Sequence, residues 1–493
     1  MSKQLPERAN LTHLRKQAKD LLQAFRAGEP EAIERLSRPG GGVPRLHDVQ
    51  RALAREYGFA SWRNLVEHIE STRTDAEKQF IERTWRGDHW RQSGPAQPDL
   101  ELAKLSSAVA LMSGDVRAVR QELARDPEFH KKKVGAKQVE PLQYVCYSGC
   151  LQNSDVKPKL LEIARLLLEA GANPNATYAY DDHQNSALSC LYGCAGSNGC
   201  VELTEMLLDA GANPNDGECL YHSAEQHDSA CFELLLKRGV TIEGTNALAR
   251  LLDFEKPREL KILLDAGAKP SHGELQHAIG RGRSPEIVRM LLDAGADALA
   301  TDKRGLTPIE LAVMNARFDL VALFETLDDR PLSPAVSAIR DALSPGHIIP
   351  DEKPEIDPKY GWALELAASR NDADGIKALI AMGLDPNSLE PFNGAPALHS
   401  ACFNGHLSAA RALLDGGASL ETQDRMYKGF PLGWLCVGSR MMANTPGDFV
   451  GVAKLLIERG HRYKSADNPD AESFGDGARE DVQEYLRSIG AIF

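Results

Sequence analysis

The feature that most constrains the fold of this 493-residue chain is a short ending that recurs along most of its length. A pair of apolar residues, usually Leu-Leu, is followed within a few positions by Gly, as in LLLEAGANPN (166–175) and MLLDAGANPN (206–215). A Gly there can adopt the left-handed conformation that ends a helix, and the following Asn-Pro prevents the helix from continuing. Each ending therefore predicts a helix C-terminus. The glycines at this position are Gly171, Gly211, Gly239, Gly267, Gly295, Gly383, Gly417, Gly460 and Gly490.

A second piece recurs roughly 20 residues before these endings and predicts the start of another short helix. It reads EPLQYVC (140–146), SALSC (186–190), GELQHAI (273–279), TPIELAV (307–313) and PALHSAC (396–402). The repeating unit is then a helix, a turn, a second helix and a loop. One such unit cannot bury its own apolar face, so the units must stack, which predicts an all-α solenoid. The abundance of Ala and Leu and an aromatic content of only 6% agree with closely packed helices.

These motifs resemble ankyrin repeats over about residues 100–493. The Thr-Pro-Leu-His-x-Ala opening of that family is matched in two places, and its Asn-Gly-His turn is matched at 404–406. The matching residues are Thr307, Pro308, Ile309 and Ala312, then Pro396, Leu398, His399 and Ala401. The resemblance implies stacked helix pairs with projecting hairpin loops.

The spacing of the endings predicts where the chain divides. Three spacings of 28 residues are shorter than the 33 of the family and predict trimmed hairpin loops. Residues 331–358 contain six prolines and no clear repeat, apart from a degenerate helix at 335–343. We therefore expect a helical N-terminal region at 1–92, a first ankyrin block at 93–330, a Pro-rich break at 331–358 and a second block at 359–493. The segment 113–129 reads as the start of the array.

The N-terminal region differs from the repeats in charge. It has 17 Lys and Arg against 13 Asp and Glu, which leaves 40 against 57 for residues 93–493 and a net charge of −17 there. An apolar stripe at 10–27, a second helix at 31–36 and helices after Asp48 and Ser61 predict a small helical bundle. REYGFASW (55–62) resembles the segment that precedes the repeats in bacterial ankyrin proteins. Basic side chains on the first helix leave a nucleic-acid-binding regulator as an alternative, although a solvated helix face is the simpler interpretation.

Clusters of reactive side chains have structural interpretations here. Two cysteine pairs have the i, i+4 spacing that could hold zinc, namely Cys146 with Cys150 and Cys190 with Cys194. Cys at the repeated position is, however, typical of core packing. His222, His277 and His399 are expected to hydrogen-bond loop backbone of adjacent units. His183 lies in a polar, aromatic loop with Asp181 and Asp182, which we interpret as an interaction loop, with a catalytic or metal site as the alternative. Trp85 and Trp90 in WRGDHW are expected in the core or in an end cap. No phosphate-binding loop, nucleophile elbow or zinc-protease motif is present, so we predict neither a metal, a cofactor nor an enzyme.

The resemblance implies a protein–protein interaction scaffold or adaptor that grips its partner with loop tips and the concave face. The candidate contact residues on the loop tips are Tyr178, Tyr180, Asp181, Asp182, Asp302, Lys303, Arg304, Asp424, Arg425, Met426 and Tyr427. The acidic repeats favour a protein partner with a basic patch. Alternatives are an inhibitor or immunity-type protein, an effector directed at a host, or an enzyme with a recruiting repeat arm. The nine scattered cysteines and the absence of a long apolar run predict a cytoplasmic protein that does not enter a membrane.

Overall fold

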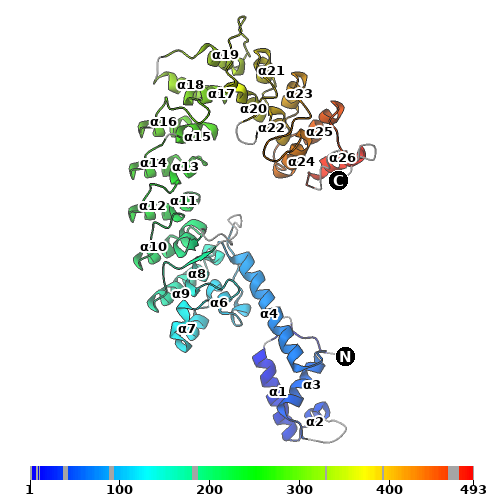
Figure 1. Ribbon diagram of the computed structural model, residues 1–493. Coiled ribbons are helices and arrows are strands. Elements are labelled where there is room, and N and C mark those ends of the chain that lie inside the picture. Colours follow the sequence, from blue (N-terminus) through cyan, green and yellow to red (C-terminus); the bar gives the residue numbers. More distant parts are fainter. Residues whose placement is uncertain are drawn as a thin grey trace. The chain divides into compact units, whose positions relative to one another are not determined.

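Short helices in antiparallel pairs make up nearly all of the regular structure of this chain (Figure 1). The computed structural model describes residues 3–6, 9, 11–36, 43–87, 94–179, 187–271, 273–327, 330–390, 394–464 and 477–491. Within these residues the only sheet has two strands. The all-α repeat solenoid expected from the sequence is confirmed. The chain divides into two compact units, Met1–Arg250 and Leu251–Phe493.

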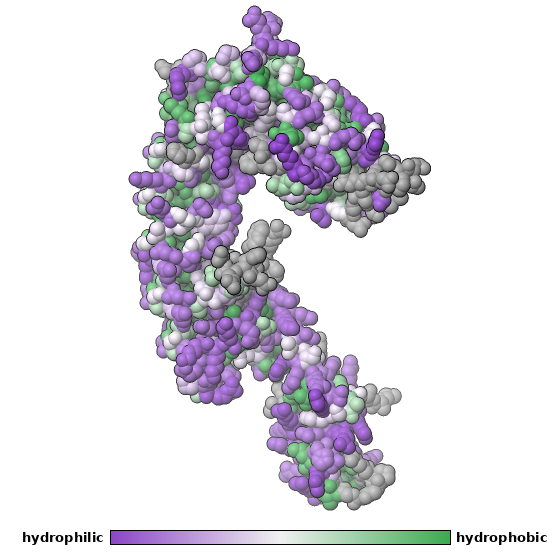
Figure 2. All heavy atoms as spheres, in the orientation of Figure 1, coloured by the Kyte–Doolittle hydropathy of each residue, from purple (hydrophilic) through white to green (hydrophobic). Residues whose placement is uncertain are grey.

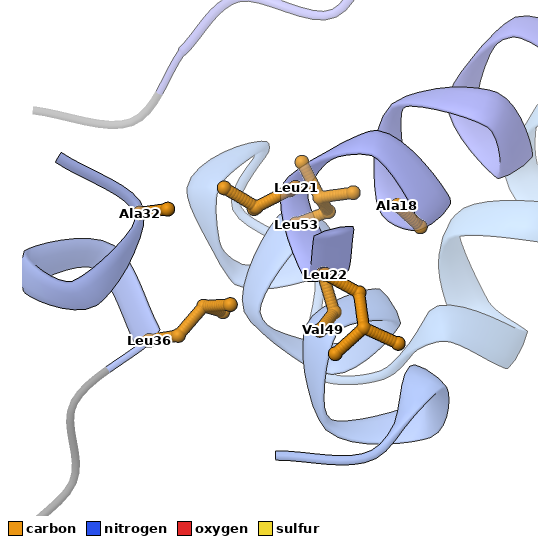
Figure 3. Packing of buried hydrophobic residues seen from close by; sticks show 7 residues of the cluster. All are labelled: Ala18, Leu21, Leu22, Ala32, Leu36, Val49 and Leu53. Carbon is orange, nitrogen blue, oxygen red and sulfur yellow. The ribbon is translucent and has the colours of Figure 1, made fainter. Parts of the chain in front are cut away.

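The N-terminal part of the first unit is a small helical bundle with its own apolar core. Its helices are α1 (Leu11–Arg26), α2 (Pro30–Leu36), α3 (Leu46–Glu56) and α4 (Trp62–Thr84). Ser61 caps α4 by accepting a hydrogen bond from the Asn64 amide at 3.1 Å, as its position in the sequence predicts. Figure 3 shows one core cluster, which brings together three helices through Ala18, Leu21, Leu22, Ala32, Leu36, Val49 and Leu53.

Helix α4 is longer than expected and connects this bundle to the repeats. It packs on α6, and Trp85, the residue after it, is only 1% exposed. The Trp85 ring stacks on Tyr147 with ring centroids 4.7 Å apart, and the Arg86 amide donates to the Tyr147 carbonyl at 2.9 Å. The core position expected for Trp85 is confirmed, and Trp90 lies outside the described residues.

The remainder of the first unit consists of stacked helix pairs. Asp115 caps α7 as expected, but the repeats begin earlier, because α6 pairs with α7. The segment 186–190 was expected to open a helix; instead, Ala187–Ser189 forms a strand and the helical turn begins at Cys190. Pairing of this strand with Thr177–Ala179 overrides the helical preference of its Ala and Leu. The elements are α5 (Leu100–Ala103), α6 (Ser107–Ser113), α7 (Val116–Arg125), η1 (Pro127–Lys131), α8 (Pro141–Cys146), η2 (Gly149–Gln152), α9 (Lys157–Glu169), β1 (Thr177–Ala179), β2 (Ala187–Ser189), η3 (Tyr192–Ser197), α10 (Val201–Asp209), α11 (Cys219–Ser223), α12 (Ala230–Lys237) and α13 (Ala247–Leu251).

The predicted helix endings are confirmed, because all nine shared glycines have positive φ, from +77° at Gly239 to +108° at Gly383. The 28-residue repeats are shortened in two ways. Their hairpins are brief, and in addition the opening helices α11 and α13 have only five residues each. The expectation that the loops alone are trimmed is therefore incomplete.

The second unit has two rows of helices. Helices α20, α22 and α24 contact one another in sequence, as do α21, α23 and α25, and each member of the first row packs against the next helix in the chain. We call α20, α22 and α24 the inner row. The elements are α14 (Pro257–Asp265), α15 (Glu274–Gly280), α16 (Pro285–Asp293), α17 (Pro308–Met314), α18 (Phe318–Glu325), α19 (Pro334–Leu343), η4 (Pro358–Gly361), α20 (Trp362–Ser369), α21 (Ala373–Ala381), α22 (Ala397–Phe403), α23 (Leu407–Asp415), α24 (Pro431–Met441), α25 (Phe449–Glu458) and α26 (Glu480–Ser488).

The Pro-rich segment contains α19, close to the helix expected at 335–343. This helix contacts both α17 and α21. After the segment, the Lys359 ammonium donates to the Gly305 carbonyl at 3.0 Å, and the Tyr360 hydroxyl donates to Glu310. Repeats on the two sides of the segment thus share direct contacts. The division into separate blocks at 331–358 stays a prediction.

Candidate partner-binding surface

The candidate residues at 302–304 form a tight hairpin in which only one side chain is fully exposed. One Asp302 carboxylate oxygen accepts hydrogen bonds from the amides of Arg304 at 2.8 Å and Leu306 at 3.0 Å. Burial would raise the pKa of Asp302, but these bonds and those from the Arg304 side chain outweigh it and lower the pKa. The Arg304 guanidinium also lies 4.0 Å from the centroid of the Trp362 ring. Asp302 and Arg304 therefore shape the hairpin, while Lys303 is exposed at its tip.

A second hairpin, at 424–429, is built in the same way around a buried aspartate. Asp424 is 1% exposed, and its carboxylate accepts from the Tyr427 amide at 2.5 Å, the Gly429 amide at 2.8 Å and the Trp434 indole at 2.9 Å. Burial would raise the pKa of Asp424, but the indole and the two amides outweigh it and lower the pKa. This arrangement fixes a loop from which Arg425, Met426 and Tyr427 project into solvent.

The third candidate hairpin is described only in part. Tyr178 lies on β1, where its ring is half-buried and edge-on to both Trp85, at 5.2 Å, and Tyr147, at 5.1 Å. The Trp85 indole donates to the Tyr178 hydroxyl at 3.3 Å. Tyr178 is thus part of the packing around Trp85. Tyr180, Asp181, Asp182 and His183 lie outside the described residues.

Helix α24 of the inner row carries apolar side chains that the sequence reasoning missed. Val437 is 44% exposed and Met441 is 67% exposed, and Trp434 is half-buried. Their i, i+3, i+7 spacing puts them on one face of the helix. That spacing in PLGWLCVGSRM (431–441) is the signal that could have identified them.

The cysteines of the chain are packing residues. All nine are buried thiols, so the core interpretation is confirmed for each of them. Burial is the main cause that raises the pKa of Cys146 and of Cys194. In the part of the chain that the structure describes, no group of three or more His, Cys, Asp or Glu side chains is arranged to hold a metal.

The three expected structural histidines do not all act alike. His399 fits the prediction, because its ring contacts the Gly429 carbonyl of the next hairpin at 3.2 Å, and burial lowers its pKa to about 4. His277 instead lies 3.1 Å from Asp253. His222 contacts Glu225 at 2.9 Å and Glu218 at 3.3 Å. For these two the predicted backbone contact was wrong, because carboxylates lie within reach of the ring.

Comparison with known proteins identifies the class. Residues 364–467, which span most of α20 to α25, match the family model of ankyrin repeats in three copies. Residues 364–467 are thus ankyrin repeats, a kind of repeat that serves as a protein-interaction domain.

Two curated relatives contain similar repeats. The chain is 26% identical over 250 residues to the E3 ubiquitin-protein ligase KEG of Arabidopsis thaliana, covering 42% of this chain and 15% of that protein. It is 27% identical over 224 residues to the ankyrin repeat protein nuc-2 of Neurospora crassa, covering 40% of this chain and 20% of that protein. The matches thus span a fifth or less of each relative. These relatives come from a plant and a fungus, so a bacterial origin stays a prediction.

Among the described helices, none combines the length and the apolar character needed to cross a membrane.

Proposed function

We propose that this protein is an interaction scaffold or adaptor that binds a partner protein through its hairpin tips and the exposed face of its inner helices. The observation that carries the proposal is the hairpin at 424–429. Its buried aspartate holds a fixed loop, and Arg425, Met426 and Tyr427 are exposed on it. Because the loop is already ordered, a partner would pay little conformational entropy to bind it. Tyr, Arg and Met are also enriched at protein interfaces.

Of the candidate contact residues, the exposed ones are the stronger candidates. We assign contact roles to Lys303, Arg425, Met426 and Tyr427. Asp302, Arg304, Asp424 and Tyr178 would act by shaping the loops, since their polar or aromatic groups already have partners within the chain. Binding, rather than catalysis, is then the role of the repeats.

The proposal is tested by affinity capture from the source organism. The full chain should retain a partner that is lost with the tip variant R425A/M426A/Y427A. A matched control is S408A/R411A on helix α23, where both residues are also exposed. Recovery of no stable partner in any condition, or equal recovery with the tip variant, would contradict the proposal.

Three finer points belong to the same proposal. Outside residues 424–441, a basic patch on the partner would be attracted to the acidic repeats, because residues 93–493 carry a net charge of −17. The association rate should therefore fall as salt increases. An association rate that does not change with salt would contradict this electrostatic attraction. The nine buried thiols support a reducing, cytoplasmic location. An inhibitor or a host-directed effector would use the same surface, and the identity of the captured partner distinguishes them.

A further inference from the structure

An unpartnered apolar face lies beside the 424–429 hairpin in the second unit. We define the α24 surface as Tyr427, Trp434, Val437 and Met441. Tyr427 is 69% exposed, and its ring lies edge-on to Trp434 with centroids 6.2 Å apart. The face therefore continues from the hairpin tip along the helix, and Trp434 and Met441 are about 10 Å apart at a rise of about 1.5 Å per residue. Figure 2 shows polar and apolar residues side by side on the face in view. The α24 surface is an ordered run of four apolar or aromatic side chains, of which Tyr427, Val437 and Met441 are exposed.

The opposite side of α24 is fully used by the core, so the exposed face is not a packing defect. Leu432 and Leu435 are buried. At Gly438 the helix approaches α22 so closely that a Cβ would lie 2.0 Å from the Phe403 carbonyl oxygen. The helix is held at that distance, and it cannot rotate to bury Val437 and Met441.

The α24 surface is also ordered before any partner binds. The hydrogen bond from the Trp434 indole to Asp424 and the edge-on contact between Trp434 and Phe403, at 5.9 Å, fix the largest ring of the face. Trp and Tyr are enriched among the residues that contribute most to binding energy at protein interfaces.

Three exposed cations lie on the hairpin and on α24 beside the face. Arg425, Lys428 and Arg440 are exposed, and no carboxylate among the described residues lies within ion-pair distance of them. Arg440 is three residues after Val437, which places it on the flank of the face. Some other cations of this unit form ion pairs, as in Arg459–Asp415, Lys377–Asp374 and Arg479–Asp481.

The carboxylate of the hairpin, Asp424, is buried, and it accepts hydrogen bonds from the hairpin and from Trp434. The acidic net charge of the whole chain has little influence here, because charges beyond a Debye length of about 8 Å are screened at physiological salt.

We propose that the α24 surface binds a partner segment that is acidic and carries large apolar side chains, with the apolar groups on Trp434, Val437 and Met441 and the carboxylates on the flanking cations. This inference rests on the proposed function and names the chemistry of the partner at that site. A basic segment would face unpaired like charges, and a purely apolar one would leave three cations without counterparts. The segment is a docking peptide of another protein.

The experiment pans a phage-displayed random 12-residue peptide library on the full-length protein. Enriched peptides should combine Asp or Glu with Trp, Phe or Leu. Binding should weaken at least tenfold in V437E/M441E, because both apolar contacts are lost and negative charge is added. The matched control is L327E, which puts Glu at another exposed apolar position, 54% exposed, and should bind as wild type. The wild type, V437E/M441E and L327E should have the same melting temperature, which would show that both variants fold.

The charge part of the inference has its own variant. The variant R425E/K428E should bind the same peptides more weakly, and the affinity of these peptides should depend less on salt than it does for the wild type. Enrichment of basic peptides, unchanged binding in V437E/M441E, or no enrichment at all would overturn the inference. If the wild type instead forms a dimer that M441E abolishes in analytical ultracentrifugation, a second copy is the occupant and the inference is also wrong. The proposed function would survive these results if capture still depended on the hairpin tips.

Discussion

Replacing Asp424 by Ala tests how the 424–429 hairpin is held. The substitution removes the acceptor for the Gly429 amide and the Trp434 indole, and for the Tyr427 amide at the tip. A hydrogen bond to a charged group contributes about 1.5–3 kcal/mol, and such contributions do not add fully. The Tyr427 amide can be rehydrated because it lies at the exposed tip, so we count two bonds. The expected cost to local stability is about 3–4 kcal/mol.

Asp424→Asn should cost less, about 1–2 kcal/mol. The side-chain oxygen of the Asn can still accept from Gly429 and Trp434, while its side-chain nitrogen would face the Tyr427 amide, another donor.

The contribution of the wild-type Asp424 carboxylate to stability also depends on pH. Because the folded pKa of Asp424 is lowered, this stabilisation is complete above the unfolded value of about 3.9 and is lost as pH falls through the folded pKa.

The assay is amide hydrogen exchange, because stacked repeats open locally rather than in one global step. About 3 kcal/mol corresponds to roughly 100-fold faster exchange of the hairpin amides in Asp424→Ala. Asp302→Ala is the matched control, since it removes the equivalent carboxylate from the 302–306 hairpin and should leave 424–429 unchanged. Exchange at the wild-type rate in Asp424→Ala would show that this carboxylate does not hold the hairpin.

Three further predictions concern other parts of the chain. Trp85→Ala should destabilise the first unit by about 3–5 kcal/mol by leaving a cavity, seen in calorimetry as a lowered transition; an unchanged profile would contradict the core role of this ring. The nine buried thiols should react with a disulfide reagent only after denaturation, and a rapidly modified thiol in the native protein would show that one is accessible. Burial alone would lower the pKa of His222, but its bonds to Glu218 and Glu225 raise it to about 9. The stability of wild type relative to His222→Gln should therefore be greatest below about pH 6.5 and should decline as pH rises through about 9, and a pH-independent difference would exclude this charge effect.

The repeat architecture could be predicted because its signals are local. A left-handed Gly after paired apolar residues needs only the chain itself to end a helix, and the glycines from Gly171 to Gly490 have the expected φ. The caps at Ser61 and Asp115 are equally local. By contrast, the strand at Ala187–Ser189 depends on pairing with Thr177–Ala179, and neither strand is recognisable alone.

The contact roles of the candidate residues stay predictions, but the structure shows how two of their carboxylates are used within the chain. Asp302 and Asp424 belong to the hairpin tips by sequence, yet their carboxylates fold back onto backbone amides. The sequence does not show whether an aspartate faces solvent or its own loop, since both uses are common in turns. Val437 and Met441 were missed because apolar residues on a short helix are first interpreted as core, and only the packing of Gly438 against α22 shows that they point away from it.

Binding of a partner protein by the hairpin tips and the inner row can be measured directly by hydrogen exchange of the full chain, with and without the captured partner. We expect slower exchange in the partner complex at residues 424–441, where the 424–429 hairpin and α24 lie. Protection confined to the outer-row helices α21, α23 and α25, or to the N-terminal bundle of α1 to α4, would contradict this expectation.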